Sequence, residues 1–87
     1  MNVIKTPIDG LLIIEPRVFH DARGYFVETY NEQRYREAGV DAMFVQDKQA
    51  CSTYGVVRGL HFQKPPYTQA KLVSCTKGRV LDVAVDL

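Results

Sequence analysis

Hydrophobic and polar residues alternate along much of this chain with the period of two that is typical of β-strands. The clearest run is RVLDVAVDL at 79–87. One face of a strand there would carry Leu81, Val83, Val85 and Leu87. Asp82 falls on the opposite face, where its neighbours are small or aliphatic. The pattern therefore predicts a strand with one apolar face.

Other β-rich runs follow one another through the sequence. Strands are predicted at 10–15, 17–19, 25–30, 43–50, 54–63 and 71–76. The stretch DARG at 21–24 has the composition of a turn, and Lys77-Gly78 is a plausible hairpin turn between the last two strands.

One segment, NEQRYREAG at 31–39, has helix signals instead. Asn31 is a good N-cap, Glu32 suits the first turn, and Gly39 is a good stop, so we expect a short helix of about two turns. Many short strands with a single helix indicate an all-β sandwich or barrel.

Length and charge limit the possible classes of protein. The 87 residues suffice for one small domain, and 46% of them are hydrophobic, an ordinary value for a globular chain. The net charge is +1, which gives no reason to expect a nucleic-acid or membrane partner.

Cysteine usage and the chain start favour a cytoplasmic protein. Cys51 and Cys75 form neither a CxxC motif nor a dense disulfide framework, so we expect two reduced thiols. No secretory signal is recognisable, and the longest aliphatic run, 11–14, is too short to span a bilayer.

The sequence stops within the well-patterned strand at 79–87. An unpaired hydrophobic strand is an aggregation hazard. Two explanations stay open: a partner subunit covers that edge, or the chain is a fragment of something longer.

The stretch RGLHFQ at 58–63 carries the strongest chemical signal. By strand parity His61 and Gln63 share a face, opposite two apolar residues, and Gly59 is suited to a bulge that re-aims a side chain. A solvated strand face that happens to carry one histidine explains His61 equally well.

The spacing resembles the first metal-binding motif of the cupin family, with changed residues. Gly55, His61 and Gly78 match, but Gln63 stands at the second histidine and Lys71 at the acidic ligand. A protonated lysine has no lone pair and repels a cation. The resemblance implies a cupin with no metal and a fixed positive charge at that place.

A wider set of segments resembles the dTDP-4-dehydrorhamnose 3,5-epimerase (RmlC) family of the cupin superfamily. The matching segments are EPRVFHDARGYFVETYN, FVQD, RGLHFQ, QAKLV and GRVLDVAVDL, in that order. The resemblance implies the N-terminal portion of a cupin-type double-stranded β-helix, or jelly roll, with one short helix. Residues 1–87 are then a single cupin-type domain, truncated at its C-terminus.

The resemblance also implies a reaction and its catalytic residues. The family epimerises C3 and C5 of dTDP-4-dehydro-6-deoxy-D-glucose without a cofactor, giving dTDP-4-dehydro-L-rhamnose. His61 matches the base, and Lys71 matches the residue beside the C4 oxygen, where positive charge stabilises an oxyanion. Asp82 is either the partner that orients Lys71 or an exposed polar residue.

Substrate contacts carry over from the same resemblance. Arg58 matches a pyrophosphate contact, for which the planar arginine fork is well suited. Further matches are Gln46 and Asp47 for the substrate, and Arg23 and Glu28 for the nucleotide end across a homodimer interface. Lys48 stands where the family has asparagine, which puts nucleotide binding at that point in question.

Two other functions remain open. A related 3-epimerase or ketoisomerase acting on a dTDP-4-keto sugar would differ in which carbon is protonated. Alternatively, a truncated chain would be inactive and would only bind sugar nucleotide or dimerise. No tyrosine here matches the family's catalytic acid, and the aspartate that orients the base is also expected beyond Leu87.

Overall fold

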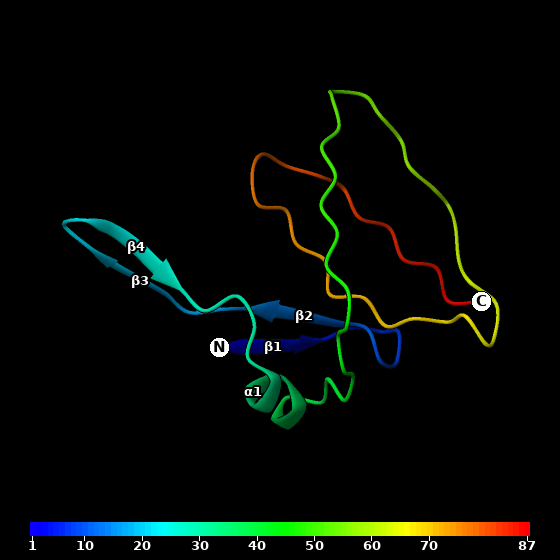
Figure 1. The fold of residues 1–87 in the computed structure, drawn as a ribbon, viewed down its shortest axis with the longest axis horizontal. Coiled ribbons are helices and arrows are strands. Elements are labelled where there is room, and N and C mark those ends of the chain that lie inside the picture. Colours follow the sequence, from blue (N-terminus) through cyan, green and yellow to red (C-terminus); the bar gives the residue numbers. More distant parts are fainter. The chain divides into compact units, whose positions relative to one another are not determined.

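The computed structural model describes residues 1–87, and its regular secondary structure is mostly β, with four strands and one short helix (Figure 1). Two compact units are distinguishable, and each is described by itself. One unit comprises Met1–Asp41 with Leu81–Leu87, and the other comprises Ala42–Val80. All of the strands and the helix lie in the first unit.

The first sheet is an antiparallel pair of β1 (Asn2–Lys5) and β2 (Leu12–Glu15). The connecting loop is fixed by Thr6, whose hydroxyl donates to the carbonyl of Leu11 at 2.8 Å and accepts from the amide of Ile8 at 3.2 Å. The strand predicted at 10–15 is confirmed. β1 is not among the predicted strands; its four residues, NVIK, show no clean alternation.

The second sheet is a hairpin of β3 (Val18–Asp21) and β4 (Gly24–Val27). The two residues between the strands form the tight turn that the DARG stretch predicts, so the turn and both strands are confirmed, although residues 28–30 of the predicted second strand lie outside β4. Phe19 pairs with Phe26 across the hairpin, and the guanidinium of Arg17 lies 4.7 Å from the Phe19 ring centroid.

The helix α1 (Glu32–Glu37) has the caps that the sequence predicts. The side chain of Asn31 accepts from the amide of Arg34 at 3.0 Å, which satisfies one free donor of the first turn. At the other end, the amide of Val40 donates to the carbonyl of Tyr35 at 2.8 Å, while Gly39 has a φ of +102°. This is the Schellman arrangement, in which glycine adopts the left-handed conformation at low cost.

Tyr35 is the only buried hydrophobic residue, with 4% of its surface exposed. Its hydroxyl donates to the carbonyl of Thr29 at 2.7 Å, and its ring meets the Tyr30 ring edge-on at a centroid distance of 5.0 Å. Burial raises the pKa of the Tyr35 hydroxyl above its ordinary value, and the charge of Glu28 raises it further. These contacts fix α1 against the segment that precedes it.

Residues 42–87 differ from the sequence prediction. The runs at 43–50, 54–63, 71–76 and 79–87 form no strands, and the turn predicted at Lys77-Gly78 has no strands beside it. Alternation decides which face a side chain takes, but a strand also needs a neighbour that bonds its backbone groups. Because residues 54–63 are not paired as a strand, the structure does not support the prediction that His61 and Gln63 share one strand face.

The apolar positions of these runs are correspondingly exposed. Leu81 and Leu87 have 90% of their surface accessible, and Val57 has 88%. Side chains of this kind normally pack against a second layer of structure. In the described residues no helix has the length and apolar character to cross a bilayer.

Candidate functional site

Arg58, one of the residues expected to bind substrate, has hydrogen-bond partners within its own unit. The chain reverses just before it, where the amide of Val56 donates to the carbonyl of Thr53 at 3.3 Å. Gly55, the third residue of this turn, has a φ of +86°, the sign that a type II turn requires at that position. The turn brings Arg58 back towards the residues that precede it.

Two hydrogen bonds hold the Arg58 guanidinium. Its Nε donates to the hydroxyl of Ser52 at 2.8 Å, and its Nη2 donates to the carbonyl of Cys51 at 3.3 Å. Sequence reasoning did not single out Ser52. A contact across six residues has no signature in a linear pattern unless the intervening turn is already known.

Gly59, two residues before His61, has a backbone conformation that requires glycine. Gly59 has a φ of +129°, which other residues rarely adopt, and a Cβ placed there would lie 3.7 Å from Nδ1 of His61. The imidazole is exposed and has no hydrogen bond or ion pair. Its orientation is therefore set by the chain and not by a polar partner.

The remaining predicted residues of this unit are also exposed. No hydrogen bond or ion pair is formed by the side chains of Gln46, Asp47, Lys48 and Lys71. Asp82 is exposed and unbonded in the other unit. The predicted contact between Asp82 and Lys71, and the catalytic roles of both, stay predictions.

Arg23, expected at the nucleotide end, lies at the tip of the β3–β4 hairpin. Its Nη2 donates to a carboxylate oxygen of Asp21 at 2.6 Å, and its amide donates to the other oxygen at 2.8 Å. The Arg23 side chain is the main cause of a lowered pKa at Asp21, and the Arg23 amide adds to it. Arg23 also lines an open hollow with the exposed rings of Tyr25 and Phe26.

Glu28, the other residue expected at the nucleotide end, follows β4. Its carboxylate accepts a hydrogen bond from Nη1 of Arg34 on α1 at 3.3 Å. Each of the two residues thus has a partner of opposite charge within the same unit. The Asp21 partner could have been found from the sequence, since an aspartate two residues before the amide it binds is a known turn signal, whereas Arg34 has no such signal.

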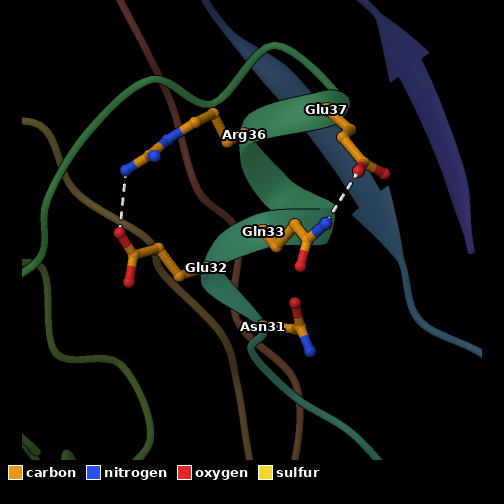
Figure 2. A pocket seen from close by; sticks show the side chains of 5 residues that line it. All are labelled: Asn31, Glu32, Gln33, Arg36 and Glu37. Atoms are coloured by element: carbon orange, nitrogen blue, oxygen red, sulfur yellow. Dashed lines mark hydrogen bonds and ion pairs between the residues drawn. The ribbon is translucent and has the colours of Figure 1, made fainter.

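A second hollow lies on the surface of α1 and contains none of the predicted site residues (Figure 2). The side chains lining it belong to Asn31, Glu32, Gln33, Arg36 and Glu37. Figure 2 shows that four of them pair along the helix: Arg36 with Glu32 at 2.7 Å, and Gln33 with Glu37 at 3.4 Å. Pairs at this spacing stabilise a helix surface, which explains these residues without a ligand.

Metal-binding side chains do not gather in the structure. Across residues 1–87 no group of three or more His, Cys, Asp or Glu side chains is placed to hold an ion. The absence of a metal from the reaction stays a prediction, since it was inferred from Gln63 and Lys71 in the sequence.

Comparison with known proteins identifies the family. The model of the dTDP-4-dehydrorhamnose 3,5-epimerase family matches residues 5–87, and the chain therefore belongs to that family. A protein of this name from Shigella flexneri is 56% identical over all of the chain, which covers 49% of that relative. One from Methanothermobacter thermautotrophicus is 54% identical over 97% of the chain, or 45% of the relative.

A more distant relative agrees with these two. The dTDP-4-dehydrorhamnose 3,5-epimerase of Pseudomonas aeruginosa is 48% identical over all of the chain and 48% of its own length. The chain thus spans about half the length of the curated relatives it matches. No solved structure gives a significant match.

The Asp21–Arg23 pair predicts an acid-dependent hairpin. Because the pKa of Asp21 is lowered in the folded hairpin, its contribution to stability is complete above the ordinary carboxyl value of about 4. That contribution is lost as the pH falls through the lower value of the folded state. We expect the amide NMR signals of residues 23 and 24 to shift towards unfolded positions in that acidic range.

Asp21→Asn should abolish this acid transition while keeping the turn, because its amide oxygen still accepts from the Arg23 backbone. Asp21→Ala should weaken the turn at every pH, because both acceptors are lost. Asp9→Asn removes an exposed carboxylate with no hydrogen bond and should change nothing. An unchanged acid transition in Asp21→Asn would contradict this assignment.

Proposed function

We propose that the protein carrying this chain is a dTDP-4-dehydrorhamnose 3,5-epimerase that needs no cofactor. Its substrate is dTDP-4-dehydro-6-deoxy-D-glucose, and its product is dTDP-4-dehydro-L-rhamnose. The observation that carries the proposal is the family match over residues 5–87, which includes the whole RGLHFQ stretch.

The proposed chemistry follows from the position of the ketone. C3 and C5 both adjoin the C4 carbonyl, so removal of a proton from either carbon gives an enolate. His61 accepts that proton as the general base. The Lys71 ammonium stabilises the negative charge on O4, and Asp82 keeps that ammonium oriented. Reprotonation from the opposite face of the sugar inverts the carbon.

The proposed binding residues are those that suit a sugar nucleotide. Arg58 contacts the diphosphate, which its hydrogen-bonded guanidinium supports. The hollow that Arg23 lines with Tyr25 and Phe26 supports a role at the nucleotide end. The other members of the proposed set are Glu28, Gln46, Asp47 and Lys48.

The wider setting is part of the same proposal. Residues 1–87 contribute to a single cupin-type jelly roll, whose remaining strands would pair with the runs at 54–63 and 71–76. The active protein is a homodimer in which Arg23 and Glu28 serve the partner's site. Both cysteines are free and exposed, which fits the reducing cytoplasm.

The structure of residues 1–87 favours a second candidate function, an inactive chain that only binds sugar nucleotide or self-associates. The predicted base and its electrostatic partner have no polar contacts, and the apolar residues of 42–87 are exposed. Such a surface favours self-association and leaves the reacting groups unpositioned. On its own the chain would then bind or associate without turnover.

The role of His61 is tested by His61→Asn in the protein at its full natural length. We expect hydrogen exchange at both C3 and C5 in deuterated water to fall by about 10²–10⁴-fold, the usual contribution of general-base catalysis. The matched control is His20→Asn, which removes the other histidine, on β3, and should leave exchange unchanged. Exchange near the wild-type rate in His61→Asn would show that His61 is not the base.

Independence from metal follows from Gln63 and Lys71, which stand where metal cupins place ligands. Dialysis of the full-length protein against a chelator should leave its turnover of the keto sugar unchanged. A loss of turnover that a divalent metal restores would contradict the proposal.

A further inference from the structure

We propose that Ser52, together with the carbonyl of Cys51, positions Arg58 so that the end of its guanidinium meets the diphosphate of the substrate. The inference rests on the proposed function and adds a residue that the family resemblance did not supply. The hydroxyl of Ser52 lies 2.8 Å from Nε of Arg58, and the Cys51 carbonyl lies 3.3 Å from Nη2.

The donors of the guanidinium identify the edge that remains available. Arginine has five N–H donors, of which one is on Nε and two are on each terminal nitrogen. In Arg58 the Nε donor and one Nη2 donor are used within the chain, and both belong to the side edge of the fork. Three donors stay free, and two of them, one on Nη1 and one on Nη2, lie at the end of the fork. A diphosphate oxygen pair is therefore bound end-on.

Ser52 is not needed to form the turn. The turn is closed by the backbone bond from Val56 to Thr53, and its reversed geometry is accommodated by Gly55. Ser52 itself is exposed, and its hydroxyl has the single contact with Arg58. Loss of the hydroxyl should therefore leave the local chain path intact while releasing the guanidinium.

Fixing Arg58 before substrate arrives lowers the cost of binding. Arginine has a long side chain that loses much conformational freedom when it is immobilised. If the free protein already holds the guanidinium in place, binding of the diphosphate does not have to immobilise the side chain, and affinity is not reduced by that loss of conformational entropy. Since the diphosphate does not change during epimerisation, the effect should appear in binding and not in the chemical step.

Ser52→Ala in the full-length protein tests this, with dTDP and thymidine as calorimetric probes. We expect about tenfold weaker binding of dTDP, the range of one hydrogen bond to a charged group, and unchanged binding of thymidine, which lacks phosphate. KM for the keto sugar should rise by a similar factor at constant kcat. Ser52→Thr keeps the hydroxyl and should restore binding.

The matched control is Ser74→Ala, which removes an exposed hydroxyl that has no hydrogen bond. Equal dTDP affinity in Ser52→Ala and wild type would overturn the inference alone. Equal losses for dTDP and thymidine, or no recovery in Ser52→Thr, would show a general structural effect and also overturn it. A wild-type protein that binds no dTDP would instead refute the proposed function and, with it, this inference.

Discussion

The pairing of backbone hydrogen-bonding groups is the constraint on which the rest of this structure depends. Strands form only where another strand accepts and donates their backbone bonds. In the first 41 residues the neighbour is close in sequence: β3 and β4 are joined by a two-residue turn, and β1 and β2 by a short loop held by Thr6. From residue 42 onward no strand forms, although the apolar alternation there is at least as clear as in the first 41 residues.

The same constraint decides which site residues have defined surroundings. Arg23 and Arg58 are held by partners two to seven residues away, across turns that the local sequence can form. His61 and Lys71 have no such local partner, and the roles proposed for them depend on groups elsewhere in the fold. A site built on several strands cannot be assembled until those strands are paired.

Local signals in the sequence predicted the local structure well. The caps at Asn31 and Gly39 gave the helix, and the DARG stretch gave the hairpin, because both elements are stabilised by contacts within a few residues. Alternation predicted strands at 54–63 and 79–87 that the structure does not form, because the period of a sequence contains no information about its neighbour. The resemblance through RGLHFQ is confirmed at the level of the family, whereas the Ser52–Arg58 contact depends on a turn that is visible only in the folded chain.

We infer that the runs at 54–63 and 71–76 become strands only when further chain pairs with them. Amide hydrogen exchange of these two segments tests it, first in residues 1–87 alone and then in a chimera with the second half of the Shigella flexneri relative. We expect rapid exchange in both segments of the isolated chain and slow exchange in the chimera, since paired amides are protected. Slow exchange in the isolated chain would contradict this inference, because these segments would then be strands without any additional partner.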